Sequence, residues 1–192
     1  MINMKYDVKK ITGVAVLLAI EIVLQTIGNY ISLGPISINL SLIPIALGAI
    51  MYGPFAGALL GFINGVVVLF APSTQALFLA YAPLGTVITC LLKCTIAGLV
   101  AGFAYKLIAK KNSLLAAIIA SLLVPIINTG LFALASFTIV IKAIEALNGG
   151  NANLMRFVFI ALIGWNFIFE LSVTAVLSPT LARVINIIKK EQ

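Results

Sequence analysis

The stretch Ile36–Phe70, ISINLSLIPIALGAIMYGPFAGALLGFINGVVVLF, decides the fold. It contains two apolar segments on either side of Tyr52-Gly53-Pro54, and Asn64 lies well inside the second segment. Its other amide and hydroxyl side chains lie at its start, at Ser37, Asn39 and Ser41. Frequent Gly and Pro would indicate loops in a soluble protein, but in a stretch without charge they favour short membrane helices packed through small faces. We therefore predict a closely packed helical hairpin within a membrane.

The composition of the whole chain excludes a soluble globular protein. Hydrophobic residues make up 62% of the 192 residues and charged residues only 9%, against about 45–50% and about 25% in typical soluble domains. A membrane-spanning helix needs about 20 apolar residues, which leaves room for about five to seven spans. We predict that residues 1–192 form a single integral membrane domain.

The net charge of +7 does not indicate nucleic-acid binding, because no basic stripe with interleaved aromatic residues is present. The basic residues instead gather in three clusters at the ends of apolar runs. The positive-inside rule places all three clusters on the cytoplasmic face, which requires an even number of spans. The clusters are Lys5, Lys9 and Lys10; Lys106, Lys110 and Lys111; and Arg183, Lys189 and Lys190.

Apolar runs, Gly-Pro turns and polar loops divide the chain into six predicted spans, in agreement with the charge clusters. We expect Pro125 to interrupt the fifth span. The sequence therefore predicts an all-α membrane protein, a bundle of six transmembrane helices with cytoplasmic N- and C-termini. The spans cover approximately residues 11–28, 39–52, 55–71, 83–108, 114–145 and 154–188.

Two patterns within the predicted spans concern helix faces. Gly57, Gly61 and Gly65 follow one another at a spacing of four, which indicates close helix packing more than ligand contact. Glu21 and Gln25 form a polar stripe on the first span. A carboxyl group within a span is a candidate functional group. Glu21 could equally face a neighbouring helix or subunit, and the sequence leaves both interpretations open.

Polar side chains at comparable depth in several spans predict a cavity that opens to the outside. With a rise of about 1.5 Å per residue, Asn64, Lys93, Asn128 and Asn166 all fall in the outer or central part of the bundle. Asn39, at the start of the hairpin, is a further candidate for the cavity. The alternative is that buried asparagines stabilise helix contacts. We favour a substrate-binding pocket formed by these residues.

Lys93 requires an anion or a water-filled cavity, because an isolated ammonium group in hydrocarbon is costly. Glu170 is the internal partner available, and the carboxylate of a ligand would be the external one. We predict that Trp165 supplies a flat apolar wall beside Lys93 and Glu170.

Catalytic and metal-binding patterns are not found in the sequence, so we do not expect an enzyme or a cofactor. The chain has no His, and Cys90 and Cys94 lie one helical turn apart within an apolar run, as expected for buried free thiols. No phosphate-binding motif for ATP is present either. Active transport would therefore need other subunits.

The chain resembles the S components of energy-coupling factor (ECF) transporters, which are small membrane subunits that capture a vitamin outside the cell. The resemblance is carried by the predicted six-helix topology, by Ala15-xxx-Ala19, and by the runs IPIALGAIMYGPFAGALLGFINGVV (43–67) and LVAGFAYKL (99–107). It implies a prokaryotic plasma membrane and a partner module with a transmembrane scaffold and two ATPases. It also implies that Ala15 and Ala19 pack on the scaffold and that the subunit topples to deliver its vitamin.

The resemblance identifies the family but not the vitamin. Among the family's substrates, pantothenate best matches one cation and several amides, because it is an acid with hydroxyl and amide groups. The alternatives are an S component for cobalamin, pyridoxine, folate or riboflavin. A stand-alone secondary transporter or channel would have only Glu21 and Glu170 as coupling carboxylates, and no internal repeat is evident. A structural membrane subunit without a ligand is the other alternative.

Overall fold

A computed structural model describes residues 4–31, 37–149 and 153–190. The described residues are almost entirely helical, which confirms the all-α part of the prediction. In chain order the helices are α1 (Met4–Gly28), α2 (Leu42–Tyr52), α3 (Pro54–Leu69), the π-helix η1 (Thr74–Leu79), α4 (Pro83–Ile108), α5 (Ser113–Ser136), α6 (Ile141–Asn148), α7 (Leu154–Arg156), the π-helix η2 (Phe157–Gly164) and α8 (Trp165–Lys190).

Four helical segments are long and apolar enough to cross a membrane: Val8–Gly28, Pro83–Ile108, Ser113–Ser136 and Leu154–Ser178. The helices α2 and α3 are also apolar, but they have only 11 and 16 residues. At 1.5 Å per residue they extend about 17 Å and about 24 Å, less than the hydrocarbon thickness of about 30 Å. Both are therefore short apolar helices, and the shortness that the Gly- and Pro-rich hairpin predicted is confirmed.

The predicted fifth span, residues 114–145, is corrected in two respects. The α5 helix continues through Pro125 without interruption and ends at Ser136, and α6 is a separate helix after a turn. Membrane helices tolerate proline because neighbouring groups satisfy the freed backbone. The end of α5 escaped the sequence analysis because the residues from Phe137 to Val140 are mostly apolar and contain no Gly or Pro.

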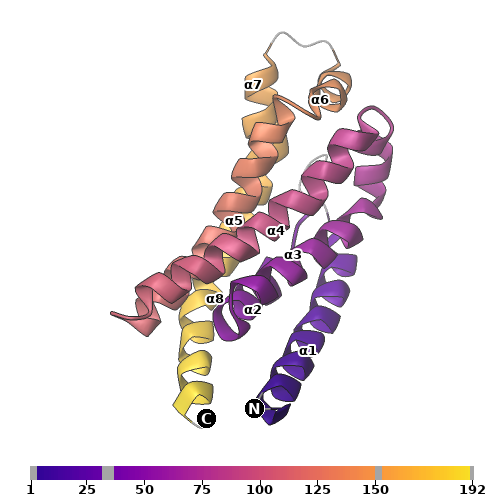
Figure 1. Ribbon diagram of the computed structural model, residues 1–192. Coiled ribbons are helices and arrows are strands. Elements are labelled where there is room, and N and C mark those ends of the chain that lie inside the picture. The colour runs from indigo at the N-terminus through magenta and orange to yellow at the C-terminus, as the bar shows by residue number, and fades with distance from the viewer. Residues whose placement is uncertain (1–3, 32–36, 150–152, 191–192) are drawn as a thin grey trace.

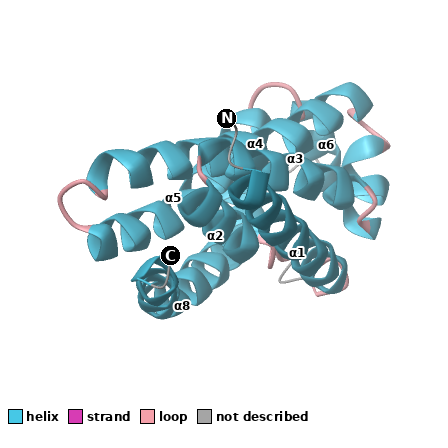
Figure 2. Ribbon diagram, turned by 60° about the horizontal axis from the view of Figure 1, so that its bottom comes forward, coloured by secondary structure: helices cyan, strands magenta, loops and turns pink. Residues whose placement is uncertain are grey.

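The short helix α2 lies at the centre of the bundle, where it contacts α1, α3, α4, α5 and α8 (Figure 2). Seven of its 11 residues are buried. A helix surrounded in this way brings the chain just before it, including Asn39 and Ser41, into the interior. The position of α2 therefore decides which polar groups can meet inside the bundle.

The glycine face of α3 packs directly against the backbone of α4. A methyl group added at Gly57 would lie 2.7 Å from the carbonyl oxygen of Gly98, and one at Gly65 would lie 2.8 Å from the Cα of Leu91. At Gly61 it would lie 2.8 Å from the backbone nitrogen of Thr95. The prediction that these glycines serve helix packing is confirmed.

The N-terminal end of α1 and the C-terminal end of α8 lie at the same end of the bundle (Figure 1). The opposite end is formed by α6, α7 and the connection between α3 and α4. One apolar core joins α2, α4 and α5, and a second core joins η1, α6, η2 and the end of α5. The polar site described next lies against the second core.

Candidate functional site

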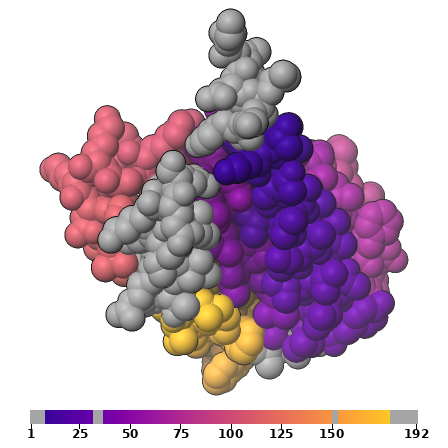
Figure 3. Space-filling view, turned by 90° about the horizontal axis from the view of Figure 1, so that it is seen from below, coloured from indigo at the N-terminus to yellow at the C-terminus, as the bar shows by residue number. Residues whose placement is uncertain are grey.

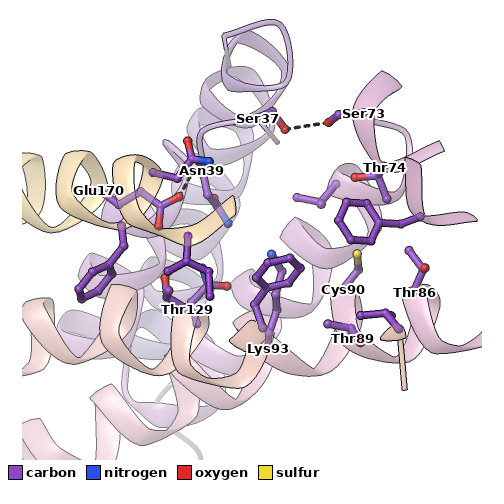
Figure 4. Close-up of a pocket in the computed structure, with 18 residues that line it drawn as sticks. Ser37, Asn39, Ser73, Thr74, Thr86, Thr89, Cys90, Lys93, Thr129 and Glu170 are labelled. Atoms are coloured by element: carbon purple, nitrogen blue, oxygen red, sulfur yellow. Dashed lines mark hydrogen bonds between the residues drawn. The ribbon is translucent and has the colours of Figure 1, made fainter. Parts of the chain in front are cut away.

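A cavity opens among six segments of the chain at the end of the bundle that is remote from the termini. Its volume is about 80 Å³, smaller than the usual range of about 300–1,000 Å³ for small-molecule sites, so that a bound molecule would have to widen it. Figure 4 shows its lining. The lining residues are Ser37, Asn39, Val68, Ser73, Thr74, Phe78, Thr86, Thr89, Cys90, Lys93, Asn128, Thr129, Phe132, Val140, Ile163, Asn166, Phe167 and Glu170.

Five of the seven predicted substrate-binding residues line this cavity. They come from elements far apart in the sequence, because the segment before α2 meets α4, α5 and α8 around the cavity. The five are Asn39, Lys93, Asn128, Asn166 and Glu170. The remaining two, Asn64 and Trp165, lie elsewhere.

Asn64 belongs to a buried hydrogen-bond network around the thiol of Cys94. The Asn64 Nδ2 donates to Cys94 Sγ at 3.1 Å, and Cys94 Sγ donates to Asn128 Oδ1 at 3.1 Å. The Ser41 hydroxyl lies 2.6 Å from Asn64 Oδ1 and 2.7 Å from Asn39 Oδ1, so that it can donate its one hydrogen to either. We call these five residues the Cys94 network. It connects α3, α4, α5 and the entry to α2 behind the cavity wall.

The Cys94 network combines the two interpretations that the sequence offered for the asparagines, a ligand pocket and the stabilisation of helix contacts. Asn64 is fully buried and hydrogen-bonded to other helices, which is the structural role considered as the alternative. Asn39 and Asn128 belong to the same network and also line the cavity. Buried polar groups that are hydrogen-bonded in this way keep a fixed position. Asn64 therefore supports the residues at the cavity surface.

Lys93 extends from α4 into the cavity beside the ring of Phe132, with Nζ 5.5 Å from the ring centroid. This distance fits a cation–π interaction. The proposed internal partner, Glu170, instead accepts a hydrogen bond of 3.0 Å from the backbone N–H of Asn39. No carboxylate of the described residues lies within 4.0 Å of the Lys93 ammonium. A cation and a carboxyl group therefore line one cavity without pairing with each other.

Trp165 does not form a wall of the cavity, and this part of the prediction is corrected. Its side chain is 66% exposed on the outside of the bundle, whereas the next residue, Asn166, is 4% exposed and lines the cavity. Adjacent residues in a helix point about 100° apart, and here Asn166 and Phe167 face the cavity whereas Trp165 points away from it. Aromatic faces come instead from Phe78, Phe132 and Phe167.

The structure also reveals hydroxyl groups that the sequence analysis did not select. Thr86 and Thr89 on α4 donate to the carbonyl oxygens of Ala82 and Gly85, each at 2.7 Å, which leaves oxygen lone pairs available to the cavity. Their spacing was a usable signal, because residues 86, 89, 90 and 93 follow one helical face that leads to Lys93. The residues selected from the sequence for the cavity were charged, amide or aromatic.

Two hydroxyl groups from separate connections meet beside the cavity mouth. The Ser73 hydroxyl lies 3.4 Å from the Ser37 hydroxyl, as Figure 4 shows. Ser37 precedes α2, and Ser73 lies between α3 and η1. The entry to the hairpin and the connection after it are therefore held together at this point.

Ala15 and Ala19 lie on α1, away from the cavity. Both residues are exposed, and α1 runs along the outside of the bundle (Figure 3). Glu21 and Gln25 on the same helix are buried and do not line the cavity. The two sides of α1 therefore differ in chemistry, with small residues facing outward and a polar pair facing inward.

The arrangement suits reversible binding of a small polar molecule. It offers a cation, a carboxyl group, amides and hydroxyls within one cavity, together with aromatic faces. Convergent polar groups on a mostly apolar scaffold are typical of ligand sites.

Comparisons with known proteins identify the family. The family model described as "ECF transporter, substrate-specific component" matches residues 9–182, nearly the whole chain. No curated protein and no solved structure matches the chain. The match covers every element that lines the cavity, and it agrees with the resemblance seen in the sequence. This bundle of apolar helices around a polar cavity therefore belongs to the family of substrate-specific components of ECF transporters.

Proposed function

We propose that the cavity captures a small, water-soluble vitamin that carries a carboxylate, with pantothenate as the leading candidate. Membership of the family means that this chain is the substrate-specific component of a membrane transporter. The observation that carries the finer proposal is the Lys93 ammonium, which lines the cavity beside Phe132 without a carboxylate partner among the described residues. A ligand carboxylate would supply the missing anion.

The remainder of the cavity is compatible with the other groups of pantothenate. Its hydroxyl and amide hydrogens would donate to Glu170 and to the oxygens of Thr86 and Thr89, and its amide oxygen would accept from Asn128 or Asn166. Each of these residues lines the same cavity as Lys93. Folate has more aromatic surface than this mostly polar set of residues would contact. The binding of pyridoxine or cobalamin would not need the positive charge of Lys93.

We further propose a single domain of six spans, with α2 and α3 as the two short ones and both termini in the cytoplasm of a prokaryotic cell. Both ends of the chain at one end of the bundle (Figure 1) support an even number of crossings. The turn between α4 and α5 carries Lys110 and Lys111, which the positive-inside rule assigns to the cytoplasmic side. The cavity would then open to the outside.

Delivery of the vitamin requires the ECF module, and we propose that α1 forms the contact with its scaffold subunit. Ala15 and Ala19 are exposed small residues one turn apart, which allow another helix to approach closely. Two ATPase subunits would supply the energy, since this chain has no phosphate-binding motif of its own. In the proposed cycle the subunit topples on the scaffold and the cavity turns inward.

The experiment that tests the substrate is identification of the ligand released from the purified protein by mass spectrometry, followed by titration with a panel of vitamins. The expected result is pantothenate at nearly one molecule per chain, with the tightest binding in the panel. A different vitamin at that stoichiometry would replace pantothenate and leave the family assignment intact. Absence of both a released ligand and tight vitamin binding would overturn the proposed function.

A further inference from the structure

The inward face of α1 is polar, although the helix is otherwise apolar. Among residues 8–28 only Glu21, Gln25 and Gly28 are buried, and the exposed fractions of Glu21 and Gln25 are 0% and 1%. Leu17 packs near Gly48 of α2 on one side of Glu21, and Gly28 packs near Ile38 on the other. Glu21 therefore lies within the contact of α1 with the central hairpin.

Three oxygen atoms on this face have no hydrogen-bond partner among the described residues. They are both carboxyl oxygens of Glu21 and the Oε1 of Gln25. The Nε2 of Gln25 donates to Asn29 Oδ1 at 2.8 Å, which fixes the carboxamide and leaves its oxygen as an acceptor. Buried polar atoms almost always have a partner, so this group requires an explanation. We call Glu21, Gln25 and Asn29 the α1 stripe.

No charged side chain of the neighbouring helices faces Glu21. The helices that contact α1 are α2 and α3, and neither contains an Asp, Glu, Lys or Arg. Their single titratable side chain is Tyr52, which packs against Gly13, about two helical turns from Glu21. A carboxylate at Glu21 would therefore be a buried charge without a counter-charge, a costly arrangement within a membrane.

A proton explains the α1 stripe better than a metal ion does. Hard cations bind about six or more oxygen ligands, whereas Glu21 and Gln25 together offer three. A proton on Glu21 makes the carboxyl group neutral and turns it into a hydrogen-bond donor. Gln25 is one turn away on the same face, where its Oε1 can accept. One added hydrogen thus joins two of the three oxygens, one from each side chain.

We propose that Glu21 is a proton-binding site separate from the ligand cavity, in which the neutral carboxylic acid donates to Gln25 within α1 and can stay buried against the central hairpin. The hydrogen bonds then run from Glu21 through Gln25 to the half-buried Asn29. Loss of the proton places a negative charge in the buried part of α1 and weakens its contact with α2 and α3. This proposal does not depend on the identity of the ligand.

Infrared spectroscopy of the purified protein in lipid tests the proposal directly, because a carboxylic acid and a carboxylate absorb at different frequencies. The chain has only five acidic residues, of which four are glutamates, so isotope labelling of glutamate gives a simple spectrum. Above about pH 5, where an exposed glutamate is ionised, we expect a carboxylic acid band that Glu21→Gln removes. Glu145→Gln, at an exposed site on α6, should retain the band.

The first outcome uses the natural chain alone and does not depend on the folding of a variant. If the labelled natural chain shows no carboxylic acid band above about pH 5, the proposal is wrong. If Glu170→Gln removes the whole band and Glu21→Gln does not, the proton belongs to the cavity instead, and the proposal is also wrong. Sodium that converts the Glu21 band to a carboxylate band would assign the site to a cation and overturn the proton assignment.

Thermal unfolding as a function of pH gives a second measurement. If folded Glu21 holds its proton and the exposed residue ionises, unfolding releases a proton, and stability falls as pH rises above about 4.3. We expect the melting midpoint of the natural chain to fall with pH relative to that of Glu21→Gln. Glu145→Gln should follow the natural chain. Parallel curves for the natural chain and Glu21→Gln would contradict the proposal.

Discussion

The Cys94 network and the α1 stripe are two groups of buried polar residues that satisfy their hydrogen bonds differently. The Cys94 network connects the entry to α2 with α3, α4 and α5, and its hydrogen bonds run between these elements. The α1 stripe bonds only along its own helix and leaves three oxygens without a described partner. The first group joins segments around the cavity, whereas the second led to the proposal of a proton bound at Glu21. Whether a buried amide or carboxyl group is hydrogen-bonded thus depends on the partners that neighbouring elements supply.

The largest expected effect comes from moving apart the helices that carry the Cys94 network. A side chain at Gly61 would meet the backbone of Cys94 and Thr95, which cannot move aside without separating α3 from α4. Gly61→Leu should therefore destabilise the protein by about 3 kcal/mol or more, at the upper end of overpacking. Gly130→Leu is the matched control, because Gly130 is exposed and a Cβ added there meets no atom within 4 Å. Thermal unfolding of the purified variants measures both, and similar midpoints would contradict the close α3–α4 contact.

The next effect concerns the outward side of α1, opposite the α1 stripe. Ala15→Trp adds bulk where the scaffold helix should approach, so uptake by cells should be abolished while ligand affinity stays within about twofold. Ala19→Trp should behave in the same way. Transport of labelled ligand in cells and titration of the purified subunit give the two readings. Weaker ligand binding in either variant would show that this side affects the cavity.

A smaller effect is expected from Lys93, whose charge distinguishes the cavity from the α1 stripe. Lys93→Met removes the charge and keeps an unbranched side chain of similar length. An anionic ligand should therefore bind about 10- to 100-fold more weakly, because hydrogen bonds to charged groups contribute about 1.5–3 kcal/mol. An uncharged amide analogue of the same ligand should lose much less. Calorimetric titration of both compounds provides the comparison. Equal losses for the two compounds would remove the argument for a ligand carboxylate.

The smallest effect on ligand binding should come from the α1 stripe itself. Glu21→Gln keeps a neutral group of the same size at a position that does not line the cavity. Ligand affinity should therefore change by less than about twofold, because sites without shared partners are usually coupled by at most about 0.5 kcal/mol. Titration at neutral pH measures this. A large loss of affinity would mean that the α1 stripe and the cavity form one site.

The sequence by itself determined the class of the protein, because an apolar chain with so few charges can be stable only in a membrane. It also predicted the close packing of Gly57, Gly61 and Gly65, since a spacing of four places them on one helix face. Likewise, it selected the Lys93 and Glu170 side chains, because ionisable side chains are costly in hydrocarbon and are therefore rare there without a function. The resemblance to the S components followed from the same residues and is confirmed by the family match.

Only the tertiary structure decided how the polar residues divide. Position along a helix gives depth but not the direction of a side chain relative to other helices, so the sequence could not separate Trp165 from Asn166, which point about 100° apart. Nor could it show that Glu170 bonds to the backbone of Asn39 and leaves Lys93 beside Phe132. It left Cys94 as a buried thiol, because its bonds to Asn64 and Asn128 form only when α3, α4 and α5 meet. Such contacts depend on how helices distant in sequence pack together, which no local pattern contains.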